Sequence, residues 1–317
     1  MLDFLSEPMR DPTVLAIPFF VTMMLLEIFA AVRSERGAGM ASGGIDPDGV
    51  DPAAPHSVGA YEGRDARASI YMGLVSIGTS AVWKFLALFV YVALFAYVAP
   101  WQLPANQWYT WAIGFVVLDF LFYWDHRISH RVRLVWATHQ AHHSSEYFNF
   151  ATALRQKWNN SMAMVMFAPL VVLGVPPAVV FAVYSLNLIY QFWIHTEHIG
   201  TMWKPFEFVM NTPSHHRVHH GSDAEYLDRN YGGVFIIWDR MFSSFQKEVQ
   251  RPRYGLTKPV DTYNIWKLQT FEYAAIGHDV RRAPTLRAKL GYIFGPPGWT
   301  PEPGTVPAPA DKASQSA

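Results

Sequence analysis

The 317-residue sequence contains no cysteine. This absence excludes disulfide bonds, thiolate zinc sites, thiolate-ligated iron–sulfur clusters and a cysteine nucleophile. Any metal ion that the protein binds must therefore be held by imidazole and carboxylate groups.

Charged residues are also scarce, since Asp, Glu, Lys and Arg make up 16% of the chain, against about 25% in an average soluble domain. The formal net charge is zero, so we expect no nucleic-acid partner. Hydrophobic residues, in contrast, make up 51% of the chain and aromatic residues 15%. This balance favours a membrane protein.

Several catalytic motifs are missing as well. The sequence has no Walker-type loop, no G-x-G-x-x-G and no G-x-S-x-G. The H-E-x-x-H of metalloproteases is absent, because His195-Thr196-Glu197-His198 has a different order and spacing. The Glu-x-x-His pairs of soluble di-iron bundles are missing too.

Long apolar runs predict an all-α integral membrane protein with about three spanning helices and a helical hairpin. Three runs approach the length of a span: Thr13–Val32, Val82–Ala99 (after an interfacial lead-in from Ile70) and Tyr109–Trp124. Ser161–Phe192 is interrupted by Gly174-Val175-Pro176-Pro177 and predicts the hairpin.

The runs contain three charged residues, Glu27, Lys84 and Asp119. We expect Glu27 to lie near the membrane surface or to face other helices, and Lys84 to extend its ammonium group to the surface. Lys and Arg cluster in 33–69 and 126–158, whereas the turns 101–108 and 174–177 contain neither. The positive-inside rule then places these basic segments in the cytoplasm and the N-terminus outside, in a bacterial inner membrane.

The histidines are concentrated in one region of the sequence. Of 13 histidines, 11 lie between His126 and His220. Eight of them form one pair at i, i+4 and two H-x-x-H-H motifs at i, i+3 and i+4, which in a helix share one face. Thr212 and Pro213 predict the start of the helix that carries the last motif, and Gly221 its end.

With His195, these motifs give nine candidate metal ligands: His126, His130, His139, His142, His143, His195, His216, His219 and His220. Nine imidazoles exceed the roughly four ligands of one zinc ion and suit two ions with four to five ligands each. Imidazole suits iron, zinc and copper alike, so the ligand type alone does not choose the metal.

Four further residues are candidates for orienting the ligands. His198 and His215 adjoin better placed histidines, and Glu146 and Asp239 are candidate acceptors for imidazole N–H groups or nearby basic residues. His56 and His278 lie outside the cluster. We expect His56 to be a surface histidine and His278 to have a structural role.

The three motifs resemble the histidine boxes of the fatty acid hydroxylase/sterol desaturase superfamily of membrane di-iron oxygenases. Longer stretches are similar to its alkylglycerol monooxygenase branch and bacterial sterol-desaturase-like relatives: His142–Glu146, Thr152–Gln156, Gln191–Glu197, Asn211–Gly221, Asn230–Gly233 and Ile237–Arg240. The likeness covers about Ser69 to Phe245. It departs at Phe242-Ser243-Ser244-Phe245, where the branch usually has F-G-T-F, and at His198, which the branch does not generally share.

The resemblance implies two iron ions, with zinc as an alternative occupant after purification, and O2-dependent hydroxylation or desaturation of a lipid C–H bond. The lipid class stays open between an ether lipid, a sterol-like ring, a carotenoid and a fatty acyl chain. Electrons must come from an external donor, a tetrahydropterin, a ferredoxin or a cytochrome b5-like protein, because the chain lacks cysteine and a nucleotide-binding motif.

The expected organisation has three parts. Residues 1–68 hold the N-terminal span and a flexible cytoplasmic loop, residues 69–250 the catalytic domain with its cytoplasmic helical cap and dimetal site, and residues 251–317 a C-terminal extension with a disordered tail. A histidine-rich membrane metal-binding or transport protein without oxygenase activity is the alternative. It predicts ionisable residues lining a path inside the spans, whereas here the histidines lie outside them.

Overall fold

The computed structural model describes residues 11–41 and 57–301. In chain order the elements are α1 (Pro12–Leu15), α2 (Ile17–Ala41), α3 (Gly63–Tyr97), α4 (Trp108–Arg131), α5 (Arg133–His139), the 3-10 helix η2 (His142–Ser144), α6 (Phe150–Ala153), α7 (Ser161–Val172), α8 (Pro177–Trp193), α9 (Lys204–Val209), α10 (Pro213–His220), α11 (Ile237–Met241), α12 (Ile265–Arg282) and α13 (Leu286–Phe294). One isolated bridge joins Met210 to Phe235, and the described residues form no strand. The all-α prediction is confirmed for them.

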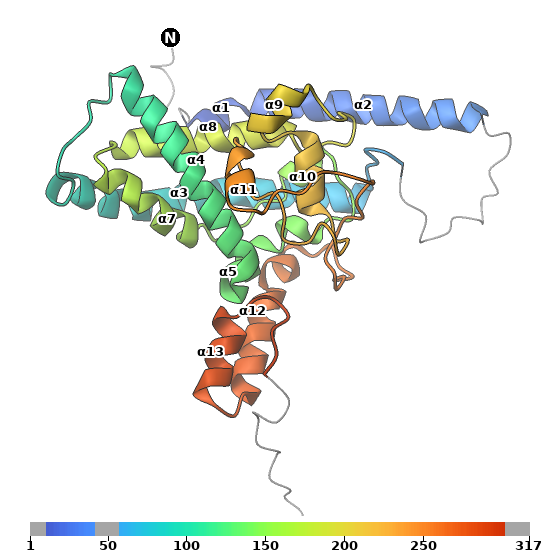
Figure 1. The fold of residues 1–317 in the computed structure, drawn as a ribbon. Coiled ribbons are helices and arrows are strands. Elements are labelled where there is room, and N and C mark those ends of the chain that lie inside the picture. Colours follow the sequence, from blue (N-terminus) through green and yellow to red (C-terminus); the bar gives the residue numbers. More distant parts are fainter. Residues whose placement is uncertain (1–10, 42–56, 302–317) are drawn as a thin grey trace, which may run out of the picture.

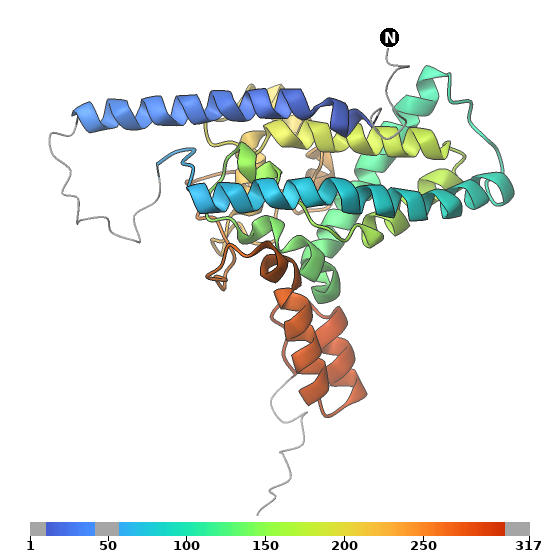
Figure 2. The ribbon, with the colours of Figure 1, turned by 180° about the vertical axis from the view of Figure 1, so that it is seen from behind.

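The long helices form one body from which the C-terminal helices project. In Figures 1 and 2, α2, α3 and α8 run roughly side by side, and α4 crosses them obliquely. Helices α12 and α13 pack against each other and extend from the body in both views, where they contact α5. Residues 1–10, 42–56 and 302–317 are outside the description, and with them His56, much of the expected loop and most of the expected tail.

The main apolar core lies between α3, α4, α7 and α8. Buried side chains from these helices, among them Tyr91, Leu118 and Phe167, pack together there. The turn that joins α7 to α8 requires glycine at Gly174, which has a φ of +86° and whose Cβ would lie 2.5 Å from Trp101 O. The chain therefore reverses at the Gly-Val-Pro-Pro sequence, where the hairpin was expected.

Three details of the helices differ from the sequence-based expectation. Helix α3 is continuous from Gly63 to Tyr97, because no Pro breaks it between the expected lead-in and span. Helix α2 continues to Ala41, beyond the point where a loop was expected. Lys84 does not extend to the surface; its ammonium pairs with Asp11 and donates to Ser185 Oγ (3.2 Å).

Helix α3 is also the only element of the described residues that is long and apolar enough to cross a membrane. Helices α7 and α8 are apolar but shorter. The total of about three spans and a hairpin therefore stays a prediction.

Glu27 ties α2 to the segments around the histidines. Its side chain is buried and accepts hydrogen bonds from the Tyr61 hydroxyl (2.5 Å), the Phe150 backbone N–H (2.7 Å) and the Thr196 hydroxyl. The carboxylate thus faces other elements, one of the two placements expected for it.

Candidate metal centre

Helix α10 follows the local signals in its sequence. Thr212 is extended, Pro213 occupies the first helical position, and the helix ends at His220 before Gly221. The boundaries predicted for this helix are therefore confirmed. Every residue of α10 is buried, so its histidines project into the protein rather than into solvent.

The nine histidines predicted as ligands converge in two adjacent groups. The five-histidine group is His126, His130, His139, His143 and His219, and the four-histidine group is His142, His195, His216 and His220. Within each group, one ring nitrogen per residue lies within 4.8 Å of all the others. Each group therefore offers a set of nitrogens that one metal ion could share.

Each H-x-x-H-H motif supplies both groups. In α10, His219 belongs to the five-histidine group, while His216 and His220 belong to the other. His142 and His143, which lie in η2, also belong to different groups, and His139 shares its group with His143. In both motifs the first and last histidines therefore share one group and the middle histidine joins the other.

The inward nitrogens are close to one another. In the five-histidine group, His139 Nε2 lies 3.0 Å from His126 Nε2 and 3.1 Å from His143 Nε2. In the four-histidine group, His195 Nε2 lies 2.9 Å from His216 Nε2 and 3.3 Å from His142 Nε2. The lone pairs of neutral imidazoles thus converge on two points.

Among the buried ring nitrogens without a hydrogen-bond partner in the described residues are Nε2 of His130, His219 and His220. Buried polar atoms of this kind are rare, because each one costs about 1–3 kcal/mol when it is left unpaired. A metal ion in each group would accept their lone pairs. The donor set, nitrogen only and without thiolate, therefore fits a histidine-ligated metal pair.

Backbone carbonyls hold the outer nitrogens of four of these rings. The Nδ1–H groups of His126 and His195 donate to Tyr231 O (2.8 Å) and Gln191 O (2.7 Å), and those of His142 and His219 to Arg155 O (3.1 Å) and Arg229 O (3.0 Å). A donor at Nδ1 leaves Nε2 as the acceptor, so these contacts set the tautomer and aim each ring inward. The sequence could not reveal them, since every residue has a carbonyl.

Burial also keeps the rings neutral. Loss of solvent lowers the pKa of His195 to about 4. Burial, followed by the neighbouring imidazoles, lowers the pKa of His143, His216 and His220 well below its usual value. Neutral imidazoles can bind a metal ion without first releasing a proton.

Of the four candidate orienting residues, only Asp239 supports a candidate ligand. It accepts hydrogen bonds from Tyr231 N (2.8 Å) and Gly232 N (2.7 Å), and so fixes the carbonyl that receives His126. The other three do not reach the two groups: His198 and Glu146 are exposed, and the His215 ring packs on Phe245 and contacts Thr212.

Asp119 and Asp228 are supporting residues that the sequence did not single out. Asp119 is buried in α4 and accepts from Val234 N (2.7 Å), Phe235 N (3.1 Å) and the Trp238 indole (2.8 Å), which anchors the segment after Tyr231. Asp228 Oδ1 lies 3.6 Å from His130 Nδ1. The charge of Asp119 inside an apolar run was the available signal for it.

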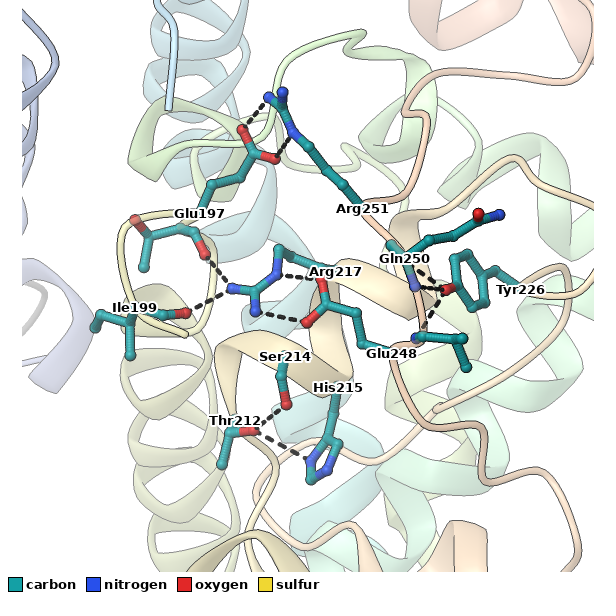
Figure 3. A network of polar contacts seen from close by, with 12 residues as sticks. Glu197, Ile199, Thr212, Ser214, His215, Arg217, Tyr226, Glu248, Gln250 and Arg251 are labelled. Atoms are coloured by element: carbon teal, nitrogen blue, oxygen red, sulfur yellow. Dashed lines mark hydrogen bonds and ion pairs between the residues drawn. The ribbon is translucent and has the colours of Figure 1, made fainter. Parts of the chain in front are cut away.

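Arg217 links α10 to the segment that follows His195. Its guanidinium donates to Thr196 O (3.1 Å) and Ile199 O (2.7 Å) and pairs with both oxygens of Glu248 (2.7 Å each) (Figure 3). Thr196 directly follows His195, so this network fixes His195 relative to the histidines of α10.

Nine histidines that a helical body gathers in two groups, within reach of two shared points, form a candidate histidine-ligated metal centre. Residues 111–244 match the fatty acid hydroxylase family, so the chain carries a domain of that family. The resemblance inferred from the histidine motifs is thereby confirmed.

The chain is similar to named members of this group. It is 37% identical to the alkylglycerol monooxygenase of Danio rerio over 287 residues, 90% of this chain and 59% of that protein, and 37% identical to that of Homo sapiens over 295 residues (93% and 61%). It is 25% identical to the ornithine lipid hydroxylase OlsE of Rhizobium tropici over 145 residues, 44% of each. The chain thus spans about three fifths of the length of these two alkylglycerol monooxygenases, and no solved structure matches it.

Proposed function

We propose that the protein is an O2-dependent oxidoreductase that uses two iron ions to hydroxylate or desaturate a C–H bond of a lipid. The observation that carries the proposal is the set of buried ring nitrogens that face inward without a partner. The fatty acid hydroxylase domain and the similarity to alkylglycerol monooxygenases and a lipid hydroxylase support the choice of a lipid.

Iron suits this role because attack on an unactivated C–H bond with O2 requires a redox-active metal, and zinc has no redox chemistry. The protein's own residues would hold and orient the pair. The five-histidine group would bind one ion and the four-histidine group the other, with fewer ligands and more room for oxygen. The carbonyls of Tyr231, Gln191 and Arg155 would keep the inward nitrogens free of protons.

We further propose that residues 69–250 form the catalytic domain, between the N-terminal part (1–68) and the C-terminal extension (251–317). In this proposal the protein is integral to a bacterial inner membrane and the histidine groups lie on the cytoplasmic side. The electron donor is external, a reduced pterin, a ferredoxin or a cytochrome b5-like protein. The apolar helix α3 and the basic residues near its start support the placement.

The test combines metal content with lipid oxidation. Protein produced with added iron should contain about two iron ions per chain and consume O2 when given an alkylglycerol and a reductant. His219→Ala should empty mainly the five-histidine group and His216→Ala mainly the four-histidine group, and both should abolish oxidation. One metal ion per chain at full occupancy would exclude the two-ion proposal.

His198→Ala is the matched control for these variants, because His198 is exposed and lies outside both groups. It should keep its iron and its activity within about twofold, as surface substitutions usually do. His215→Ala should lower iron content and activity less than His216→Ala and more than His198→Ala, because His215 is buried in α10 next to His216 although its ring does not reach either group. A metal-poor, inactive His198→Ala variant would show that the nine-ligand assignment is incomplete.

A further inference from the structure

Helix α13, which forms the C-terminal hairpin (265–294) with α12, presents a row of exposed apolar side chains. Leu286, Leu290 and Phe294 are 71%, 45% and 57% exposed, and their spacing of four residues places them on one face of the helix. The buried Ala288 lies on the opposite face, and α13 packs against α12. The row therefore points away from the protein, and no element of the described chain covers it.

Exposed basic residues border this apolar row. Arg287 and Lys289 flank it on α13, and Arg281 and Arg282 end α12; all four are exposed. A helix with an apolar face bordered by cations is typical of a segment that lies in the interface of an anionic membrane. The charge of the C-terminal hairpin therefore complements a surface that carries lipid phosphates.

The acidic side chains of the C-terminal hairpin face the body of the protein. Glu272 and Asp279 are the only acidic residues in 265–294, and each accepts a hydrogen bond from the Arg133 guanidinium (2.7 Å). The backbone N–H of Arg133 also donates to Gly295 O (2.9 Å), at the end of α13. These contacts hold both helices of the hairpin to the start of α5 and leave the outer surface of the hairpin positively charged.

The C-terminal hairpin joins the body at the level where the exposed face of α3 changes from basic to apolar. Leu268 of α12 packs with Met72 of α3. Before this level α3 exposes Arg64 and Arg67, and exposed large apolar side chains recur along 71–98. Basic residues gather just outside the hydrocarbon region of a membrane and apolar residues lie within it. The level of Met72 is therefore the expected surface of a membrane that α3 crosses.

Figures 1 and 2 show the direction of the hairpin from this level. It runs roughly across the direction of α3, and α13 lies on the side of α12 that faces the Tyr97 end of α3. The surface of a membrane crossed by α3 would therefore run along the hairpin on the α13 side. The apolar row of α13 would then face the acyl chains.

We propose that the C-terminal hairpin binds the surface of the membrane that α3 crosses. Leu286, Leu290 and Phe294 insert among the acyl chains, and the bordering basic residues bind the phosphates of anionic phospholipids. The inference rests on the proposed function, which places the protein in a membrane. Because Arg133 lies between His130 and His139 in the chain, the bound hairpin would fix the height of the histidine groups above the lipid.

The test uses the absence of cysteine from the chain, which allows one fluorophore to be placed by a single substitution. Iron-loaded full-length protein with bimane on Leu290→Cys is placed in lipid nanodiscs without reductant, and quenching by lipids brominated near the top of the acyl chain is measured. In discs that contain phosphatidylglycerol the label should be quenched at least about twofold, because an interfacial helix buries its apolar face just below the headgroups. Ala274→Cys, on the exposed face of α12 opposite the buried Ile276, is the matched control and should be quenched by less than about a tenth.

Two further variants of the labelled protein separate the apolar and the basic contributions. Leu286→Ser/Phe294→Ser removes the rest of the apolar row, and a second variant replaces the four bordering basic residues by Gln. All of these side chains are exposed, so the substitutions should leave the fold intact. Each variant should lower the quenching of the label by at least about half, and discs of phosphatidylcholine alone should lower it to a similar extent.

Equal quenching of the labels on α12 and α13 would overturn the proposal, and so would quenching that responds neither to the basic substitutions nor to the charge of the lipid. A label that lipid does not quench, and that is shielded only when two copies of the protein share a disc, would assign the row to a second copy and also overturn it. The result is independent of the reaction. Protein that oxidises lipid while its α13 label stays unquenched contradicts this inference alone, and a quenched label on protein that oxidises no lipid contradicts the proposed function alone.

Discussion

Ser243 adopts a backbone conformation that serine tolerates poorly. Among the described residues, Asp228, Asn230 and Ser243 are the residues other than glycine with a positive φ, at 60°, 55° and 59°. Asp and Asn adopt this conformation more readily than other residues. Ser243 occupies the position where the similar branch usually has glycine, and the left-handed turn explains that preference.

Ser243→Gly should therefore stabilise the protein. Removing the Cβ relieves about 1–2 kcal/mol of left-handed strain, part of which is offset by the greater freedom of glycine in the unfolded chain. We expect a net gain of about 0.5–1 kcal/mol, seen as a higher midpoint in thermal unfolding. Ser243→Ala is the control, because it keeps the Cβ and should give no gain; an equal gain in both variants would show that the side-chain hydroxyl, and not the backbone, is the cause.

At the scale of single residues, the sequence predicted which histidines come together but not how they divide. The spacing within His216, His219 and His220 is local information, and it was sufficient to select them. Their division between two groups depends on His126, His142 and His195, which come from other segments. The η2 turn that carries His142 and His143 has no sequence signature as clear as Pro213 and Gly221, which bound α10.

At the scale of elements, α2 is held to the histidine region by one carboxylate. Glu27 receives the Tyr61 hydroxyl, the Phe150 N–H and the Thr196 hydroxyl. The apolar run that contains Glu27 gives no indication of these partners, because they follow Glu27 by 34 to 169 positions in the chain. The same limit applies to Lys84, whose partner Asp11 lies 73 positions away and which was therefore expected at the surface.

Glu27→Ala should destabilise the protein by about 2–4 kcal/mol, because it leaves three buried donors without an acceptor. It should also weaken metal retention in the four-histidine group, since Thr196 adjoins His195. Thermal unfolding and metal analysis of the same preparation measure the two effects. The exposed Glu146 provides the control: Glu146→Ala should change neither quantity, and an equal loss in both variants would contradict a specific role for Glu27.

At the scale of the whole molecule, the histidine groups join segments that are far apart in the chain. Their members come from α4, α5, η2, the segment after α8, and α10. In addition, Arg155 links α3 to His142, because its guanidinium bonds Asp65 and its carbonyl accepts from His142 Nδ1. Any ion bound by the two groups would cross-link most of the helical body.

Removal of the proposed metal should therefore lower the stability of the entire protein. We expect a chelator to reduce the thermal midpoint by at least about 5 °C, since a ligand that binds only the folded state stabilises it in proportion to its binding free energy. Added iron should restore the midpoint. A His216→Ala/His219→Ala variant should be insensitive to the chelator, and an unchanged midpoint in wild-type protein that has lost its metal would contradict the prediction.

The two histidine groups share the segments that supply their ligands, and this has a thermodynamic consequence for the binding of two metal ions. Because α10 and the α5–η2 segment each supply both groups, an ion in the first group orders rings that belong to the second. The second ion then meets ligands whose conformational entropy has already been lost. Occupancy of the two sites would be positively cooperative, and by linkage the loss of either ion would loosen the other to the same extent. A half-loaded protein would consequently be a minor species at every metal concentration.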